Sequence, residues 1–303
     1  MIVVGSGGQD GTYLAALLRE RGHEVIGVER RGELSILDGS AWESDLRRLR
    51  PAAIYYLAAY HHSSEDKEAL DDGQVLRRSV DVHVVGVGNV LEAVRRSSPA
   101  TRMFYAASSH LFATGGDAPI TETTPLSPSC LYGLTKTAGV HCCRYYRQSH
   151  GLHVSVGYLF NHESPLRKPC FLSRKVVSAA VRISRGSREK LVLGDLSSRV
   201  DWGWAPDYVD AMTRMMALPE PDELIVATGE THSVRELARL AFGRLGLDAD
   251  AWVEERAGVL VKRLPPRCGD SARLRARTGW RPTVTFTDMV GRLVDAEAAA
   301  TSG

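Results

Sequence analysis

Met1-Ile2-Val3-Val4-Gly5-Ser6-Gly7-Gly8-Gln9-Asp10-Gly11 is the stretch that decides the fold. Its four apolar residues predict a short buried strand, and Gly5, Gly8 and Gly11 follow with the spacing GxxGxxG. Apolar positions at Leu14, Leu17 and Leu18 then predict a helix over 12–21. A dinucleotide phosphate site requires this order, because glycines allow close backbone approach and the helix N-terminus faces the pyrophosphate. The spacing also fits a plain glycine turn, but its position after a strand favours cofactor binding.

The composition is that of an ordinary globular protein. The chain has 303 residues, 44% hydrophobic residues, 24% charged residues and a net charge of +2. We therefore expect no polyanionic partner and no nucleic acid. Five cysteines without a CxxC spacing indicate a reducing compartment rather than a disulfide framework. We expect no signal peptide, no membrane span and a cytoplasmic location.

The segment 24–29 (EVIGVE) predicts a second buried strand that ends in Glu29. An acid about 20 residues after the glycine turn can accept hydrogen bonds from the adenosine ribose of NAD. Arg30 and Arg31 follow at once, and their guanidinium groups could instead hold the 2′-phosphate of NADP. Since a carboxylate repels a phosphate, NAD is slightly favoured over NADP.

Strands and helices alternate through the first half of the chain. Strands are predicted over 34–37, 53–57 and 102–106, and helices over 44–49 and 75–96. This alternation predicts an α/β fold with a doubly wound parallel sheet, that is, a Rossmann fold. We expect a dinucleotide-binding domain over 1–165, a smaller C-terminal lobe over 166–303, and a return to the sheet at about 223–229.

Small residues and histidines follow the strand at 53–57. Ala58 and Ala59 would let the backbone lie against a flat cofactor ring, although a tight packing contact explains them equally well. His61 and His62 have no cysteine or carboxylate at ligand spacing, so no metal site is predicted.

The residues that can carry chemistry are Ser108, Tyr132 and Lys136. Ser108 and Ser109 follow the strand at 102–106, at the sheet edge where such folds hold ligands. Tyr132 and Lys136 lie four residues apart on one helix face. A nearby ammonium group would lower the pKa of the phenol, and tyrosinate could then take a proton from an alcohol while hydride leaves its carbon.

At this point the chain resembles an extended short-chain dehydrogenase/reductase, of the GDP-mannose 4,6-dehydratase branch. The motifs that carry the resemblance run through nearly the whole chain. They are Gly8-Gln9-Asp10-Gly11-Thr12-Tyr13-Leu14, Glu29-Arg30-Arg31, Leu57-Ala58-Ala59, Tyr132 to Lys136, Leu159-Phe160-Asn161-His162-Glu163-Ser164-Pro165, Ser173-Arg174-Lys175, Leu193-Gly194, Asp201-Trp202-Gly203, Asp207-Tyr208-Val209, Ala227-Thr228-Gly229-Glu230, Ser233-Val234-Arg235-Glu236 and Gly279-Trp280.

The resemblance implies a tightly bound nicotinamide cofactor and a nucleotide sugar, expected to be a GDP-sugar, whose C4 hydroxyl is oxidised to a ketone. It assigns that oxidation to Ser108, Tyr132 and Lys136. The cofactor site it implies is Gly5, Gly8, Gln9, Asp10, Gly11, Glu29, Arg30, Ser35, Ile36, Leu57, Ala58, Ala59, Tyr132, Lys136, Leu159, Asn161 and His162. The implied substrate site is Asn161, Ser173, Arg174, Lys175 and Arg199, with the cations around the diphosphate.

One departure from the branch concerns the reaction itself. A dehydratase of this branch has a glutamate two places after its catalytic threonine or serine, and that carboxylate removes the C5 proton before water leaves C6. Here His110 stands at that position. Histidine can act as a general base near neutral pH, so dehydration stays open. A 4-epimerase needs no such base, and the substitution therefore favours epimerisation.

Other departures concern assembly and specificity. The long loop expected after Arg31 is missing, which favours a homodimer over a tetramer. Ser35-Ile36 replaces an Asp-Leu pair, Val200 replaces an arginine beside Arg199, and 264–267 (LPPR) replaces an Arg-Pro-x-Glu stretch. A 4-keto reductase and a non-catalytic dinucleotide sensor are the weaker alternatives.

Overall fold

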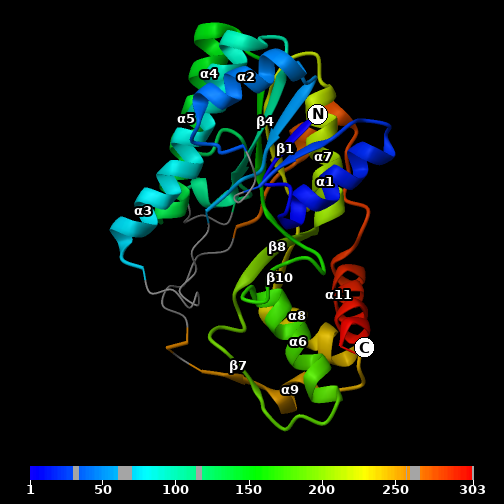
Figure 1. The fold of residues 1–303 in the computed structure, drawn as a ribbon. Helices are drawn as coiled ribbons and strands as arrows, with labels where there is room; N and C mark the ends of the chain where they lie inside the picture. Colours follow the sequence, from blue (N-terminus) through cyan, green and yellow to red (C-terminus); the bar gives the residue numbers. More distant parts are fainter. Residues whose placement is uncertain (30–33, 61–69, 114–117, 257, 260–266, 302–303) are drawn as a thin grey trace.

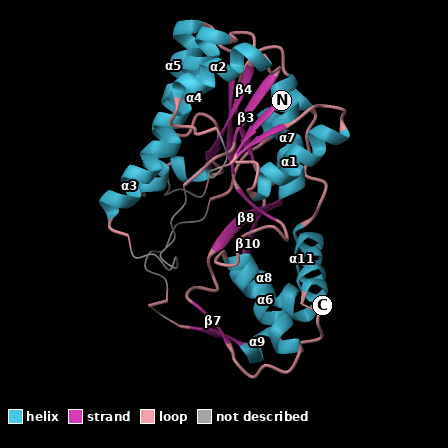
Figure 2. Cartoon of the chain, viewed as in Figure 1, coloured by secondary structure: helices cyan, strands magenta, loops and turns pink. Residues whose placement is uncertain are grey.

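The computed structural model of the chain describes residues 1–29, 34–60, 70–113, 118–256, 258–259 and 267–301. Its centre is a six-stranded parallel sheet in the order β2-β1-β3-β4-β5-β9 (Figures 1 and 2). The strands are β1 (Ile2–Val4), β2 (Ile26–Val28), β3 (Ala53–Tyr56), β4 (Arg102–Ser108), β5 (Val154–Leu159) and β9 (Glu223–Val226). The predicted doubly wound Rossmann sheet is confirmed, and residues 223–226 do return to it.

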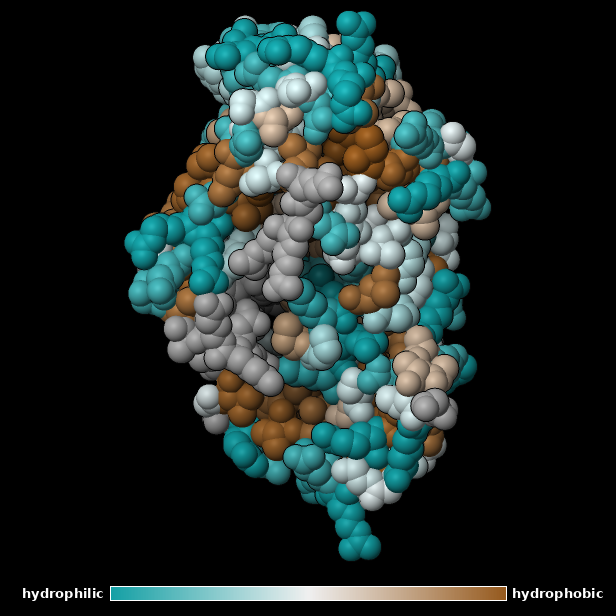
Figure 3. All heavy atoms as spheres, viewed as in Figure 1, coloured by the Kyte–Doolittle hydropathy of each residue, from teal (hydrophilic) through white to brown (hydrophobic). Residues whose placement is uncertain are grey.

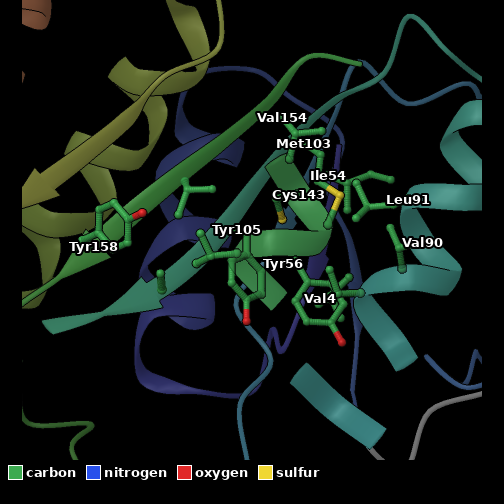
Figure 4. Packing of buried hydrophobic residues seen from close by; sticks show 14 of the residues in the cluster. Val4, Ile54, Tyr56, Val90, Leu91, Met103, Tyr105, Cys143, Val154 and Tyr158 are labelled. Carbon is green, nitrogen blue, oxygen red and sulfur yellow. The ribbon is translucent and has the colours of Figure 1, made fainter. Parts of the chain in front are cut away.

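Helices cover both faces of this sheet, which explains why its strands are continuous apolar runs rather than alternating ones. On one face lie α2 (Gly39–Leu49), α4 (Gly86–Ser97) and α5 (Leu131–His150), and on the other α1 (Gln9–Glu20) and α7 (Ala205–Ala217) (Figure 1). On the α4 and α5 side, Tyr56 and Tyr105 pack among aliphatic residues with their hydroxyls pointing the same way (Figure 4). These two layers hold the strand ends, and hence the site, in place.

The predicted helix over 75–96 forms, but with an irregularity in its middle. The helical run consists of α3 (Asp72–Val80), a π-helical turn at Asp81–Val85, and α4. A capping box formed by Asp71 and Gln74 begins it. A π turn inserts one residue into the helical repeat, and such turns often occur at functional sites.

The strand predicted over 34–37 is wrong. Residues after Leu34 form a turn in which the Leu37 amide donates to the Ser35 side chain (3.2 Å) and the Asp38 amide donates to the Ser35 carbonyl (3.2 Å). Asp38 then accepts from the Ser40 and Ala41 amides and starts α2. The segment is too short, and its serine and aspartate bind the local backbone instead of a strand neighbour.

The C-terminal part forms a smaller lobe with its own apolar core. Two small sheets, β10-β8-β6 and β11-β7, pack with helices α6, α8, α9 and α11 (Figure 1). The elements are β6 (Asn161–Glu163), α6 (Leu172–Ser184), β7 (Leu191–Leu193), β8 (Arg199–Trp204), β10 (Thr231–Ser233), α8 (Val234–Gly243), α9 (Ala249–Trp252), β11 (Val253–Glu255) and α11 (Phe286–Ala300).

Residues 223–229 are not the only part of the described C-terminal half that packs on the large sheet. Helix α7 lies against α1, and α10 (Ala272–Thr278) lies against β9 and α7. The buried Trp280 belongs to the same apolar cluster as β1 and α1. Within the described residues, none of the helices has the length and apolar character to cross a membrane.

Candidate active site

The glycine turn between β1 and α1 brings the backbone close to the end of β3. Gly5 has φ of +89°, and a Cβ there would lie 2.9 Å from the Ala58 nitrogen. A Cβ on Gly11 would lie 2.2 Å from the Gly5 carbonyl oxygen. Gly8 is the N-cap of the 12-residue α1, and no side chain caps it. The turn therefore exposes main-chain donors at a helix N-terminus, as a pyrophosphate requires.

The Glu29 carboxylate lies beside this turn, where a ribose acceptor was predicted. A Cβ on Gly7 would lie 3.0 Å from Glu29 Oε1, and Ser6 Oγ donates to the same oxygen at 3.4 Å. Arg30 and Arg31, the competing signal, lie outside the described residues, as do His61 and His62. Ser35 is exposed, and the Ile36 carbonyl accepts from Asn89 Nδ2 (3.0 Å) in the neighbouring turn. The donor and acceptor set fits a dinucleotide.

The motifs GQDG and NHESP, distant in sequence, contact each other directly. Gln9 Nε2 donates to the His162 carbonyl (3.1 Å), and Ser164 Oγ donates to Gln9 Oε1 (2.8 Å). His162 has Asp10 Oδ2 at 2.9 Å from Nε2 and the Phe160 carbonyl at 2.7 Å from Nδ1. These contacts join the start of α1 to β6. Gln9, Asp10 and His162 thus hold the glycine turn in place.

Both nitrogens of His162 face acceptors, so the ring is held as an imidazolium. Burial alone would lower its pKa, but the Asp10 carboxylate outweighs burial and raises it above its usual value. Burial would likewise raise the pKa of Asp10, but His162 holds it below its usual value. The ring stacks on Tyr208 with centroids 4.4 Å apart.

Ser108 and Tyr132 meet at the carboxyl edge of the large sheet. Ser108 ends β4, and its side chain lies beside that of Tyr132, which is in the first turn of α5. The His110 amide donates to Ser108 Oγ (3.2 Å), and the His110 ring meets the Tyr132 ring edge-on with centroids 6.1 Å apart. A serine, a tyrosine and a histidine therefore converge where an alcohol could be deprotonated.

Lys136 lies one turn further along α5 and is 1% exposed. Its Nζ donates to the carbonyls of Ala106 (2.7 Å) and Ala58 (3.5 Å). Burial lowers the pKa of Lys136 to about 7 and raises that of Tyr132 to about 12. The predicted lowering of the Tyr132 pKa by Lys136 is wrong here, because burial outweighs the nearby charges, of which Arg167 is the one that lowers it.

A cavity of about 290 Å³ opens between this edge and the smaller lobe. Its walls come from the end of β4, the β5–β6 junction, the start of α6, and strands β7 and β8. The lining residues that sequence analysis singled out are His110, Asn161, Lys175 and Arg199. Figure 3 shows hydrophilic residues gathered over the middle of the molecule, between the two lobes.

Two predicted substrate residues point elsewhere. Arg174 Nη2 donates to Glu297 of α11 (2.6 Å), and the two side chains are 13% and 12% exposed. Ser173 Oγ donates to the buried Glu163 carboxylate (2.6 Å). Neither residue lines the cavity. In the α6 sequence Ser-Arg-Lys, only Lys175 is directed to the cavity, because adjacent helix positions lie on different faces.

Comparison with known proteins agrees with this arrangement. The family model described as GDP-mannose 4,6 dehydratase matches residues 32–293. GDP-mannose 4,6 dehydratase 1 of Arabidopsis thaliana is 34% identical over 327 aligned residues, covering 97% of this chain and 88% of that protein. The chain belongs to the GDP-mannose 4,6-dehydratase family. GDP-mannose 4,6-dehydratase of Sinorhizobium fredii is 31% identical, with 97% and 95% covered.

Solved structures share the fold of this GDP-mannose 4,6-dehydratase family member. RMD from Pseudomonas aeruginosa, complexed with NADPH, has a TM-score of 0.85 at 21% identity and covers 98% of this chain and 99% of its own. Thermus thermophilus UDP-glucose 4-epimerase, complexed with NAD, has a TM-score of 0.83 at 24% identity, with 99% of each chain covered. The predicted class, an NAD(P)-dependent nucleotide-sugar dehydratase or epimerase, is confirmed, and the solved structures with this fold include a dTDP-glucose 4,6-dehydratase of Bacillus anthracis as well as the epimerase.

Sequence analysis missed three side chains near the site of this family member. Arg267 lines the cavity, and within the described part of the chain nothing hydrogen-bonds its Nε. The Arg167 guanidinium lies over the Phe171 ring, with its Cζ 3.7 Å from the ring centroid, and its Nε is 3.4 Å from Glu163 Oε2. His83 meets the Tyr132 ring edge-on at 5.4 Å. Only Arg267 had a sequence signal, as the basic residue that ends 264–267.

Proposed function

We propose that the chain is an NAD(P)-dependent enzyme that oxidises the C4 hydroxyl of a GDP-sugar or related nucleotide sugar, with net 4-epimerisation as its reaction. The observation that carries the proposal is the placement of Ser108 beside Tyr132, with the His110 ring edge-on to the Tyr132 ring. The pair lies at the carboxyl edge of β4, next to the glycine turn, and the cavity opens beside it. A non-catalytic sensor would not need a serine and a tyrosine so arranged.

In this mechanism Tyr132 removes the proton of the C4 hydroxyl, and Ser108 binds the same oxygen and orients it. Lys136, bonded to the Ala58 and Ala106 carbonyls, supports the segment that would face the cofactor. A bound oxidised nicotinamide would supply the hydride acceptor and a positive charge that favours tyrosinate. Tyr132 then returns the proton to the C4 oxygen when the sugar is reduced on its other face, with Ser108 still orienting that oxygen.

The cavity also suits a nucleoside diphosphate group. Lys175, Arg199 and Arg267 line it, and cations of this kind bind phosphate oxygens. Burial lowers the pKa of both Lys175 and Arg267, so a bound dianion would relieve the cost of burying their charges. The names of the curated relatives make GDP-mannose the first substrate to test.

His110 is the reason to favour epimerisation. It lines the cavity where a dehydratase would present its carboxylate base. Among the described residues two carboxylates line the cavity, and both are occupied: Asp195 accepts from Ser197 and Ser198, and Asp201 accepts from Thr228 and the Gly229 and Gly269 amides. Neither Asp195 nor Asp201 has the freedom of a base. The alternative is 4,6-dehydration with the His110 imidazole removing the C5 proton.

One incubation separates the two reactions. The protein is incubated with GDP-mannose and other GDP-sugars in deuterated water, and the products are analysed by mass spectrometry and NMR. We expect a C4-inverted sugar without solvent deuterium. Deuterium at C5 together with loss of water would refute epimerisation and establish the dehydratase.

Two variants assign the roles. Tyr132→Phe removes the base and is expected to abolish sugar turnover; unchanged turnover would refute the oxidation mechanism. His110→Ala is expected to leave C4 oxidation intact, and if the reaction proves to be dehydration it should stop that step alone. A 4-keto reductase would instead consume free NAD(P)H in proportion to substrate.

The cofactor and the assembly complete the proposal. The Glu29 carboxylate beside the glycine turn supports NAD over NADP, and mass spectrometry of the nucleotide released on denaturation tests this. A homodimer is supported by apolar side chains left exposed on α5 and on the π turn before α4, namely Val85 (42%), Leu134 (52%) and Tyr145 (57%). Light scattering on the purified chain decides between dimer and tetramer.

A further inference from the structure

His83 is fully buried in the π-helical turn between α3 and α4. The turn is fitted tightly to its surroundings on two sides. Tyr56 of β3 donates through its hydroxyl to the Val82 carbonyl (2.6 Å). On the α5 side, a Cβ on Gly139 would lie 2.5 Å from the His83 carbonyl oxygen. The irregular turn therefore brings His83 between the end of β3 and the catalytic helix.

The hydrogen bonds of His83 define its protonation state. The Tyr60 amide can only donate, so His83 Nε2, 3.0 Å away, accepts. Nδ1 then carries the proton and donates to Thr135 Oγ1 (2.8 Å). Thr135 in turn donates to the carbonyl of Leu131 or Tyr132 (3.0 and 3.2 Å). A second proton would set an N–H against the Tyr60 N–H, so these two hydrogen bonds require the neutral ring with the proton on Nδ1.

These bonds connect two parts of the proposed active site. One end is the backbone segment after β3, which includes Ala58 and Tyr60 and is where the cofactor ring was predicted to lie. The other end is the first turn of α5, which carries Tyr132. The His83 ring also meets the Tyr132 ring edge-on, with centroids 5.4 Å apart and planes at 87°. A buried neutral imidazole thus contacts both the tyrosine and the segment opposite it.

We propose that His83 is a positioning residue that ties the segment after β3 to the catalytic helix α5 and so sets the place of the Tyr132 hydroxyl. It acts through Thr135 and Tyr60 rather than by touching substrate. The inference rests on the proposed function, because it assigns His83 to the same Tyr132. Small displacements of a catalytic group slow the reaction strongly, and a shift of about 1 Å can lower the rate about 100-fold.

The test compares two substitutions at one position. His83→Phe keeps a ring beside Tyr132 but removes both hydrogen bonds. His83→Gln keeps one acceptor and one donor. The control is His153→Phe, which alters a half-buried histidine just before β5, at the opposite edge of the sheet. Each protein is assayed for kcat and KM, for nicotinamide fluorescence of bound NADH, and for hydrogen exchange of the Tyr60 amide.

We expect His83→Phe to lower kcat by about 10- to 100-fold with KM changed by less than about threefold. Its Tyr60 amide should exchange faster, and its bound NADH should fluoresce differently from wild type. His83→Gln should recover kcat to within about fivefold. Wild-type kcat in His83→Phe, unchanged Tyr60 exchange, or an equal loss in His153→Phe would overturn the inference.

Failure of the proposed function looks different. Wild-type protein that neither binds NADH nor turns over a sugar refutes the proposed function itself. In that case the Tyr60 exchange of His83→Phe still decides whether His83 ties the two segments together.

Discussion

The glycine-turn side of the site and the cavity wall opposite it are held together in different ways. On the first side, Gln9 and Asp10 bind His162 and Ser164 of the NHESP motif, so residues of two recognisable motifs contact one another. On the second, Arg174 turns away to Glu297, near the end of the chain, and leaves Lys175 to the cavity. Motif residues thus locate the proposed cofactor side, whereas partners without a motif decide the proposed substrate side.

The largest effect is expected where backbone meets backbone at the glycine turn. Gly11→Ala would put a Cβ 2.2 Å from the Gly5 carbonyl oxygen, a contact that no rotamer relieves. We expect a loss of about 3 kcal/mol or more in the free energy of unfolding, measured by urea denaturation, together with loss of NADH binding.

Gly88→Ala is the matched control for this change. Gly88 also lies in a helix, α4, but a Cβ there meets no atom of the described residues within 4 Å. It should be neutral or should stabilise by up to about 1 kcal/mol. If Gly11→Ala behaved like Gly88→Ala, the close approach at the turn would be refuted.

The ion pair between Asp10 and His162 comes next. Its side chains are 20% and 9% exposed, so Asp10→Asn should cost about 2 kcal/mol near pH 6, less than a fully buried pair. The pKa of His162 is raised in the folded protein. Protonated His162 therefore contributes its full share to the free energy of unfolding below pH 6.5, the ordinary pKa, and this share is lost as pH rises through the pKa of the folded protein. The pKa of Asp10 is lowered in the folded protein. The Asp10 carboxylate therefore stabilises the fold fully above pH 3.8, the ordinary pKa, and this stabilisation is lost as pH falls through the pKa of the folded protein.

A double-mutant cycle measures this pH dependence. Asp10→Asn, His162→Gln and the double variant are unfolded in urea from pH 5 to pH 9. The coupling energy should be largest between about pH 4 and pH 6.5 and should decline in more alkaline solution. A coupling that stays constant across this range would show that His162 is not held as an imidazolium.

The same contrast explains what could be predicted from sequence. The parallel sheet followed from apolar runs alternating with helical periodicity, and Ser108, Tyr132 and Lys136 do gather at one sheet edge. The prediction of a strand over 34–37 failed because the side chains of Ser35 and Asp38 accept hydrogen bonds from nearby backbone amides. The periodicity of apolar residues does not reveal such local bonds.

Packing and burial account for what stayed hidden. The Arg174 side chain bonds to a residue 123 positions away, a pairing that no local pattern encodes. The direction of the Tyr132 pKa depends on burial, which one helix turn of sequence does not reveal. His83 looked like one more residue of an amphipathic helix, because a π turn has no composition of its own.

A smaller effect should separate neighbours on α6. Arg174→Gln should lower the free energy of unfolding by about 1–2 kcal/mol, because among the described residues it leaves the mostly covered Glu297 carboxylate with the Ser178 hydroxyl as its remaining side-chain partner, and it should leave GDP affinity unchanged. Lys175→Gln should do the reverse, with GDP binding weakened about tenfold and stability nearly unchanged. Calorimetric titration with GDP and urea denaturation give the two readouts. Weaker GDP binding in Arg174→Gln would return Arg174 to the predicted diphosphate site.

The smallest effect concerns the start of α5, the helix that carries Tyr132. Cys130 is the N-cap of α5, and its Sγ accepts from the Gly133 amide at 3.4 Å. A thiol is a weak acceptor, whereas a serine hydroxyl is among the best N-caps. Cys130→Ser should therefore stabilise the protein by about 0.5–1 kcal/mol, seen as a higher urea midpoint with an unchanged slope. Cys170→Ser, outside any N-cap, is the control, and an equal gain there would mean that removing a thiol, rather than capping α5, raised the stability. Since Tyr132 lies in the first turn of α5, a firmer cap that left kcat unaltered would show that Tyr132 is already held in place by His83 and Ser108.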